Sequence, residues 1–175
     1  MYDPYAIVAG GAPRDWWMGR QAADIDVFIN VNLTHSMYVV ESVFKKMGFE
    51  LENAKHGEIA EDYKLNPYIK WVYNVKGLSH PVQLIFLNCS TFRVLQEFPL
   101  NISRIWYRYD CGVCTTPEFV QAMDTKSIIK LSELYADGNK YIRKIREKFP
   151  EFQYYNSLHT YTFHRKEYIF GENFK

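Results

Sequence analysis

Short apolar runs, separated by glycine, proline and polar residues, recur through the first half of the chain. Runs bounded in this way are typical of buried strands. They cover residues 5–9, 25–31, 68–75 and 82–87. Between the first two runs, Pro13 stands where a short helix begins and Gly19 where it ends. The pattern therefore predicts a strand, a tight turn, a short helix and a second strand, in that order.

Helical spacing of apolar residues appears next, over residues 35–47, with Thr34 as the N-cap and Gly48 just beyond the end. Further helices are expected at 91–96, 117–123 and 140–148. Residues 102–109 and 113–115 are predicted to pair as a hairpin, 126–131 fit either a strand or a helix, and 53–67 predict a loop. The remaining residues are aromatic and follow no clear period.

These elements predict an α/β (α+β) fold, in which a mixed sheet carries helices packed mainly on one face. The length of 175 residues suffices for one domain with a buried core. No repeat or linker divides the chain. We therefore expect a single domain over 1–175, with a basic helix and an aromatic tail from about residue 138 to 175.

Composition and charge exclude several classes of protein. Apolar residues make up 47% of the chain and charged residues 23%, which is ordinary for a globular domain. The net charge of +1 leaves only a local basic patch for binding a long nucleic acid. Three cysteines argue against a disulfide framework. Since the sequence has no signal peptide and no apolar stretch of about 18 residues, we expect a cytoplasmic protein without a membrane partner.

Two carboxylates stand one residue apart in the second predicted strand. Alternate side chains of a strand point to the same side, so Asp24 and Asp26 are expected on one face, with Ile25 and Val27 turned to the core. Two neighbouring carboxylates repel each other unless a cation lies between them. Mg²⁺ suits such a pair because it takes one or two carboxylates together with substrate phosphates.

A glycine pair follows the first strand, where the chain turns into the first helix. Gly10 and Gly11 let backbone amides approach a phosphate closely, and the start of a helix favours an anion. Nucleotidyl transfer requires a phosphate cradle beside a metal-binding carboxylate pair, because the metal and the amides stabilise charge on the phosphate oxygens.

The order and spacing of these residues resemble the signature of the polymerase-β-like nucleotidyltransferases. That signature is a Gly-Gly or Gly-Ser pair after a strand, a short spacer, and Asp-x-Asp on the next strand. The run Gly10-Gly11-Ala12-Pro13-Arg14-Asp15, followed by Gly19-Arg20 and Asp24-Ile25-Asp26, looks similar to the CCA-adding and poly(A) polymerase branch. The resemblance covers residues 7–29, with a weaker echo at 98–102. The compact length is similar to that of small phage-type nucleotidyltransferases.

This resemblance implies transfer of a nucleoside monophosphate from a nucleoside triphosphate to an acceptor hydroxyl, with release of pyrophosphate. The acceptor would be an RNA or tRNA end, a protein side chain or a small molecule, in the host cytoplasm if the chain is phage-encoded. The implied site consists of Asp24 and Asp26 as catalytic ligands of Mg²⁺ or Mn²⁺, and of Gly10, Gly11 and Arg14 facing the triphosphate. Asp15 is expected to pair with an arginine and to shape the turn.

One position departs from the pattern. Many members of the superfamily carry a third carboxylate on a later strand, and the matching position here is Gln83, whose amide can coordinate through oxygen but is no base. Glu97 and Asp110 are nearby acids without motif support. Too little chain follows residue 131 for the helical domain that reads the base and the tRNA in CCA-adding enzymes, so CCA addition itself is not expected.

Two other classes of function stay open at the level of sequence. The same residues also describe a degenerate, non-catalytic module that binds or senses a nucleotide, and Gln83 favours that interpretation. A pure interaction protein would show no metal-dependent nucleotide binding at all.

Three further features have a plain structural interpretation beside a functional one. The basic residues of 140–148 share one helical face, which is either solvated or a contact for RNA or the triphosphate. The aromatic residues of the tail either cover the core or stack on bases. Cys111 and Cys114 favour a hairpin turn over a zinc site, because zinc needs four ligands.

Overall fold

The computed structural model describes residues 6–30, 37–54, 66–132, 139–158 and 161. Its centre is a seven-stranded sheet in the order β3-β4-β5-β2-β1-β6-β7. The strands are β1 (Ile7–Ala9), β2 (Ile25–Asn30), β3 (Glu50–Asn53), β4 (Ile69–Lys76), β5 (Val82–Leu87), β6 (Ile105–Arg108) and β7 (Gly112–Thr115). Strands β2 and β5 pair in parallel, whereas the other neighbours pair antiparallel. The expected mixed sheet is confirmed.

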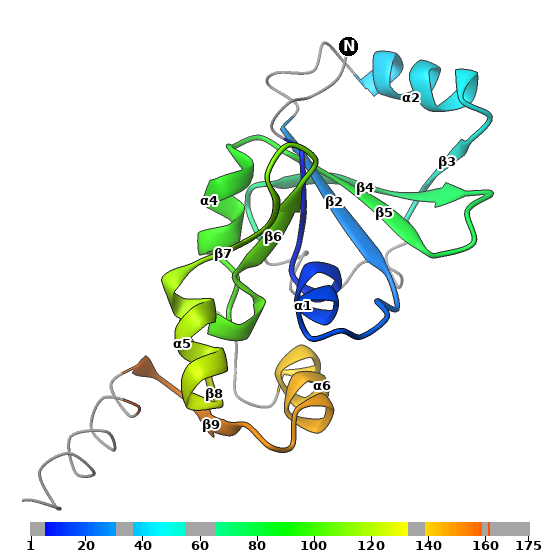
Figure 1. The fold of residues 1–175 in the computed structure, drawn as a ribbon. Coiled ribbons are helices and arrows are strands. Elements are labelled where there is room, and N and C mark those ends of the chain that lie inside the picture. The colour runs from blue at the N-terminus through cyan, green and yellow to red at the C-terminus, as the bar shows by residue number, and fades with distance from the viewer. Residues whose placement is uncertain (1–5, 31–36, 55–65, 133–138, 159–160, 162–175) are drawn as a thin grey trace, which may run out of the picture.

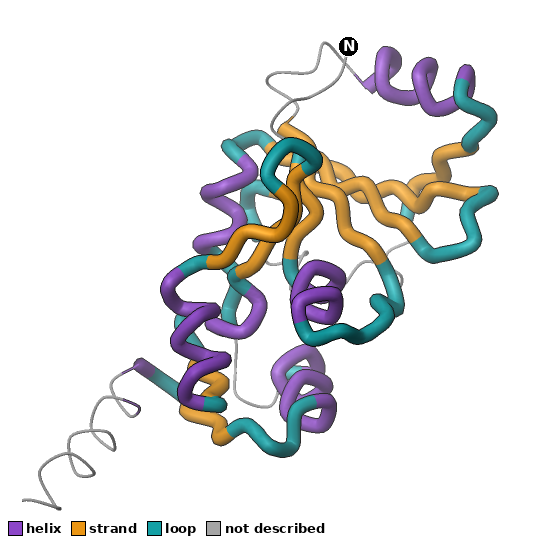
Figure 2. The backbone as a smooth tube through the Cα atoms, in the orientation of Figure 1, coloured by secondary structure: helices purple, strands orange, loops and turns teal. Residues whose placement is uncertain are grey.

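The helices surround this sheet on several sides (Figure 1). They are α1 (Gly11–Trp17), α2 (Met37–Lys46), α4 (Thr91–Gln96), the 3₁₀ turn η1 (Asn101–Ser103), α5 (Pro117–Thr125) and α6 (Lys140–Lys148). A small parallel sheet pairs β8 (Ser127–Ile129) with β9 (Gln153–Tyr155). Figure 2 shows α1, α5 and α6 gathered beyond one end of the large sheet. Within the described ranges, no helix is long and apolar enough to cross a bilayer.

Alternation along the strands gives the large sheet two apolar faces. On one face, Phe28 and Ile85 belong to a core that α4 completes. On the opposite face, Ile29 and Phe86 belong to a core against which Phe44 of α2 packs. Helices therefore lie on both faces, and they are spread more widely over the sheet than the sequence indicates.

A third apolar core lies beyond the end of the large sheet, where segments distant in sequence meet. Its fully buried members include Ile102 of η1, Phe119 of α5, Ile128 of β8, Ile142 of α6 and Phe149. Three of the helix-forming segments are therefore held together by burial of one side each, which is the usual source of helical stability in proteins. This core fixes α6 relative to η1 and α5.

The side chain of Asn101 links two segments of this third core, η1 and β8, by hydrogen bonds. It is fully buried, and its Oδ1 accepts hydrogen bonds from the N–H of Ile102 at 2.9 Å and of Ile129 at 2.8 Å. Its Nδ2 donates to the carbonyl of Ser127 at 3.2 Å. One amide side chain thus satisfies buried backbone groups of both η1 and β8.

Several elements of the structure begin and end at the residues that the sequence predicts. Strand β5 and helices α4 and α6 begin and end at the predicted residues, and the ambiguous segment 126–131 contains the strand β8. Strands β3 and β9 were not predicted, since each is short and lies in a polar or aperiodic segment. Most of the predicted loop, residues 55–65, and of the aromatic tail, residues 162–175, lies outside the described residues.

Replacing Asn101 with Ala tests the connection between η1 and β8. We expect the free energy of unfolding to fall by at least about 2 kcal/mol, because each buried group left unpaired costs about 1–3 kcal/mol. Chemical denaturation of the variant and the wild type measures this difference. Gln96→Ala, an exposed change at the end of α4, is the control and should stay within about 0.5 kcal/mol. Equal losses in both variants would contradict the assignment.

Candidate active site

The turn between β1 and α1 is shaped by Gly10. Its φ of 79° is left-handed, a conformation that favours glycine. The Gly10 N–H donates to the carbonyl of Ile105 in β6 at 3.0 Å, and its carbonyl accepts from the N–H of Arg14 at 3.3 Å. A Cβ at Gly10 would lie 3.5 Å from the ring of Phe98. The turn is therefore bonded to the sheet on one side and covered by an aromatic ring on another.

The backbone amide of Gly11 differs from that of Gly10 in its environment. Because the N–H of Gly10 is bonded to β6, Gly10 contributes shape to the turn and no donor for a ligand. Gly11 is the first residue of α1, and first-turn amides have no acceptor within their own helix. Of the two glycines predicted to face a phosphate, Gly11 is thus the one whose amide suits that role.

The register of β1 and β2 brings the glycine turn and the acidic pair to the same end of the sheet. Val8 lies opposite Val27 in this antiparallel pair, so the end of β1 meets the start of β2. Asp24 is exposed and directly precedes β2, while Asp26 is half-buried within it. The N–H of Ile25 donates to the carbonyl of Pro81 at 2.9 Å, which begins the parallel pairing with β5.

A row of polar side chains crosses the strands from Asp26 outward. Asp26 lies opposite Gln83 in β5, Gln83 opposite Asn74 in β4, and Asn74 opposite Glu52 in β3. Residues that face each other in register share one face of a sheet. Because side chains alternate along β2, Asp26 and Phe28 lie on the same face of the sheet. The polar row therefore borders the apolar core under α4.

Gln83 therefore occupies the position next to Asp26 that the sequence predicts for a third ligand. Its Nε2 donates to Oδ1 of Asn74 at 3.0 Å, and this bond fixes the amide so that Oε1 is directed away from Asn74. Glu52, at the far end of the row, forms an ion pair with Lys76 at 2.7 Å. Since neighbouring strands lie about 4.8 Å apart, Glu52 is too distant to share a ligand with Asp26.

The two other acids considered from the sequence lie elsewhere. Asp110 is in the turn between β6 and β7, and β6 meets the glycine turn at its other end, through Ile105. Its hydrogen bond from Arg108 lowers the pKa of the Asp110 carboxyl. Glu97 caps the C-terminal end of α4. Neither acid lies in the polar row.

The donor atoms beside the glycine turn fit a divalent cation such as Mg²⁺. Asp24 and Asp26 supply carboxylate oxygens and Gln83 supplies an amide oxygen, and hard cations prefer oxygen ligands of this kind. In the part of the chain that the structure describes, no group of three or more His, Cys, Asp or Glu side chains could hold a metal ion. Two carboxylates and one amide leave coordination positions open, and Mg²⁺ usually fills such positions with water and substrate phosphates.

Arg14 and Asp15 are buried, with only 3% and 2% of their surfaces exposed. The Nε and Nη2 atoms of Arg14 donate to Oδ1 of Asp15, each at 3.3 Å, which matches the expected pairing of Asp15 with an arginine. The guanidinium also lies over the ring of Phe149, 5.0 Å from its centre. Arg14 is thus adjacent to the glycine turn but packed inward, and its predicted contact with a triphosphate stays a prediction.

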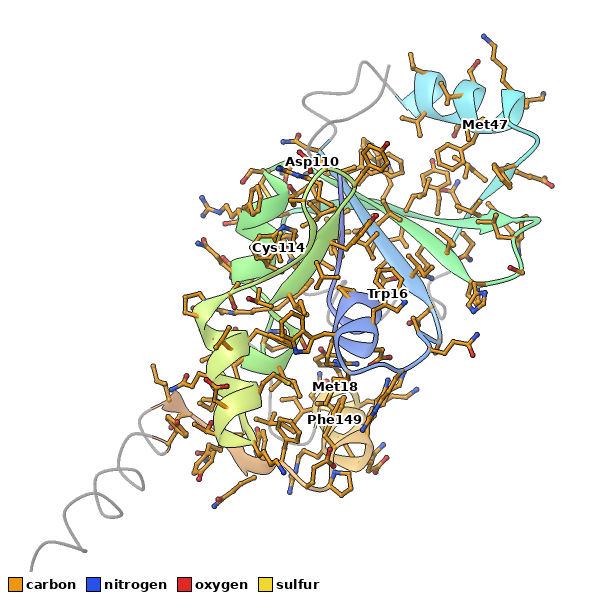
Figure 3. The ribbon with its side chains drawn as sticks, in the orientation of Figure 1. Trp16, Met18, Met47, Asp110, Cys114 and Phe149 are labelled. Carbon is orange, nitrogen blue, oxygen red and sulfur yellow. The ribbon has the colours of Figure 1, made fainter. Side chains whose placement is uncertain are left out.

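Sequence reasoning did not connect three residues, Phe98, Lys148 and Phe149, with this end of the sheet. Phe98 covers Gly10, and Lys148 and Phe149, at the end of α6, reach α1 across most of the chain. Figure 3 shows Phe149 and Met18 at the junction of α1 and α6. The sequence places Lys148 on a basic helical face that is either solvated or a contact for RNA or the triphosphate, but helical periodicity does not reveal a partner as distant as Asp15.

Cys111 and Cys114 lie in the β6–β7 hairpin, away from the acidic pair. Their sulfur atoms are 3.1 Å apart, and both thiols are free. Burial and the neighbouring Cys111 raise the pKa of the Cys114 thiol. The predicted hairpin is confirmed, but its first strand is shorter than the expected 102–109, because residues 102 and 103 belong to η1. Gly112 provides the left-handed residue of the hairpin with a φ of 70°.

Comparison with solved structures finds proteins of similar fold. No family model and no curated protein matches the sequence. The chain superposes on a tRNA-processing enzyme with a TM-score of 0.58 and 13% identity, over 95% of this chain and 42% of that one. It superposes on the Thermotoga maritima CCA-adding enzyme complexed with tRNA with a TM-score of 0.59 and 14% identity, over 86% and 35%. The chain has a polymerase-β-like nucleotidyltransferase fold.

A further structure of this nucleotidyltransferase fold is a tRNA nucleotidyltransferase complexed with a primer tRNA and an incoming ATP analogue. It matches with a TM-score of 0.59 and 12% identity, over 95% of this chain and 47% of that one. The chain thus spans less than half the length of these three structures. The fold predicted from the Gly-Gly and Asp-x-Asp pattern is confirmed, while identities this low leave the roles of individual residues as predictions.

Replacing Gly10 with Ala tests the strain in the turn, with Gly19→Ala as a matched control. Both glycines have a positive φ, 79° and 67°, so each variant should lose roughly 1–2 kcal/mol of unfolding free energy. Nothing lies within 4 Å of the Cβ position at Gly19, whereas Phe98 lies at an ordinary contact distance from that at Gly10. Denaturation curves should therefore show similar losses. No loss in either variant would contradict the left-handed assignment.

Proposed function

We propose that this protein is a metal-dependent nucleotidyltransferase, which transfers a nucleoside monophosphate from a nucleoside triphosphate to an acceptor hydroxyl. Asp24 and Asp26 hold Mg²⁺ or Mn²⁺, and the Gly10–Gly11 turn receives the triphosphate. The observation that carries the proposal is the antiparallel register of β1 and β2, which brings the turn and both carboxylates to one end of the sheet. Neither feature alone is specific, but their juxtaposition suits a metal-bound triphosphate.

The reaction that this arrangement serves is a displacement at phosphorus. The acceptor oxygen forms a bond to the α-phosphorus, the bond from that phosphorus to the bridging oxygen of pyrophosphate breaks, and the hydroxyl proton leaves to a base. A divalent cation held by Asp24 and Asp26 would, when bound, supply positive charge that neutralises the phosphate oxygens. The carboxylates of Asp24 and Asp26 fix the position of that cation, and the backbone amide of Gly11 donates a hydrogen bond to a phosphate oxygen.

For the acceptor and the nucleotide we propose a chemical class and no single compound. Among the structures that share the fold, one holds a primer tRNA with an ATP analogue and another holds CTP. These ligands favour a ribonucleoside triphosphate and an RNA end for this chain, with a protein side chain or a small molecule as the other acceptors to test. We place this reaction in the cytoplasm, a reducing compartment in which free cysteines are usual.

One observation favours a second function, a nucleotide-binding module without catalysis. Gln83 lies opposite Asp26, where a carboxylate would complete the metal site and accept a proton. An amide oxygen coordinates more weakly and takes no proton. A module of this kind binds a nucleotide with metal but releases no pyrophosphate.

The Asp24→Asn/Asp26→Asn double variant tests the proposed function. We measure pyrophosphate release from each of the four nucleoside triphosphates, with Mg²⁺ or Mn²⁺ and with cellular RNA or protein as acceptor. Release should fall roughly a thousandfold or more in the variant, because several kcal/mol of charge stabilisation are lost. Asp124→Asn, an exposed change on α5, is the control. Metal-dependent binding without any release by the wild type would establish the binding module instead.

Replacing Gln83 with Glu separates the enzyme from the module. A carboxylate opposite Asp26 supplies both a ligand and a base, so pyrophosphate release should rise about tenfold or more. Without metal, the added charge repels Asp26, so Mg²⁺ should raise the melting temperature more in this variant than in the wild type. Asn74→Ala, which removes the hydrogen-bond partner of Gln83 and leaves Gln83 in place, is the matched control. Lower activity together with an unchanged response to Mg²⁺ would place Gln83 outside the site.

A further inference from the structure

Charged side chains from opposite ends of the chain meet beside the Gly10–Gly11 turn. Asp15 of α1 is 2% exposed, and each of its carboxylate oxygens has a cationic partner. Oδ1 accepts from Arg14, and Oδ2 accepts from Nζ of Lys148 at 2.6 Å. Two cations thus share one carboxylate, and the cluster keeps a net charge of +1.

The guanidinium of Arg14 is held on several sides within this cluster. Asp15 binds it at Nε and Nη2, and the ring of Phe149 lies against it. Nη2 lies 3.7 Å from the position that a Cβ at Gly11 would take, so the cation borders the turn directly. Nη1 is buried and has no hydrogen-bond partner among the described residues. The guanidinium therefore retains a donor that its protein neighbours do not use.

Lys148 is held in place by the packing of α6 and not by the ion pair alone. Ile142, Ile145 and Phe149 on the same helix and its cap are buried in the third core. This packing directs the end of α6 toward α1. Lys148 reaches Asp15 from 133 positions away in the sequence, and its own side chain is 32% exposed. Its neighbours Lys144 and Arg143 on α6 are exposed instead.

We propose that Lys148 is a positioning residue for nucleotide binding. Through Asp15, it holds the Arg14 guanidinium beside the Gly10–Gly11 turn and leaves the cluster with one excess positive charge for the triphosphate. The inference rests on the proposed function and deepens it. Without Lys148, Asp15 neutralises Arg14 alone, and the net charge of the cluster falls from +1 to zero. An uncharged cluster attracts a polyphosphate less, while the carboxylates of Asp24 and Asp26 stay unchanged.

This reasoning predicts a selective effect on nucleotide affinity. Lys148→Met keeps the apolar stem but removes the charge, so KM for the nucleoside triphosphate should rise about tenfold, equivalent to ~1.4 kcal/mol. The value of kcat should stay within about twofold, since uniform binding and not the transition state is affected. Lys148→Arg restores the cation and should return KM to within about threefold of the wild type. Lys144→Met, an exposed change one turn earlier on α6, is the control.

The experiment combines steady-state kinetics with calorimetric binding of a non-hydrolysable nucleoside triphosphate and with melting temperatures. A double-mutant cycle with Asp15→Asn adds the decisive comparison, because a residue acting through Asp15 should have little further effect when that carboxylate is gone. Selective loss of affinity in Lys148→Met, rescue by Arg and coupling to Asp15 support the inference. A lower melting temperature with unchanged KM and affinity overturns it and leaves Lys148 with a structural role only.

Failure of the inference and failure of the proposed function give different results. If the wild type releases pyrophosphate and Lys148→Met has the same KM, only the inference is overturned. If the wild type neither binds nor turns over any nucleoside triphosphate, both are overturned. If Lys148→Met does not fold, amine-reactive labelling of the wild type decides: bound nucleotide should slow labelling of Lys148 relative to Lys144, and equal rates with and without nucleotide overturn the inference.

Discussion

The antiparallel pairing of β1 with β2 is the constraint on which the candidate site depends. Opposite Cα positions in this pair join Val8 to Val27, so the residues that follow β1 and those that begin β2 lie at one end of the sheet. The parallel pairing of β2 with β5 starts at the same end, through the bond from Ile25 to Pro81, and adds Gln83 beside Asp26. Backbone hydrogen bonds of the sheet therefore set the relative positions of all these groups.

A second constraint is the core that lies beyond the end of the sheet. It buries one side of α6 together with Ile102, Phe119 and Ile128, and it brings the end of α6 against α1. Asp15 is buried and bonded to both Arg14 and Lys148, so the contact from Lys148 to Asp15 couples this core to the glycine turn. Packing far from the acidic pair thereby determines the environment of Arg14.

The sequence predicts the local parts of this structure well and its long-range contacts poorly. The order of Gly10-Gly11 and Asp24-x-Asp26, with a helix between two strands, follows from turn chemistry and from alternation, both of which act over a few residues. Gln83 is identified through the resemblance to the family's third-carboxylate position, and the register of β2 with β5 places it opposite Asp26. Strand β3 escapes prediction because its side chains are mostly polar and it lies at the edge of the sheet. The contact of Lys148 with Asp15 escapes it because no local pattern encodes a partner 133 residues away.

The charges at this end of the sheet are divided in a way that bears on the proposed reaction. Negative groups, Asp24 and Asp26, stand at the start of β2, whereas the buried cluster of Arg14, Asp15 and Lys148 beside the turn is positive overall. A metal-bound triphosphate carries the opposite charges. Its cation would lie against Asp24 and Asp26, and its remaining negative phosphate charge would lie toward the positive cluster. Two separate poles orient such a ligand more strictly than one, because reversing it would bring like charges together. Arg14 and Asp15 are also less exposed than Asp24, so salt screens their charges less. On the proposed function, this arrangement would make the affinity for the triphosphate depend on α6 and would leave the chemistry at phosphorus to the strand residues.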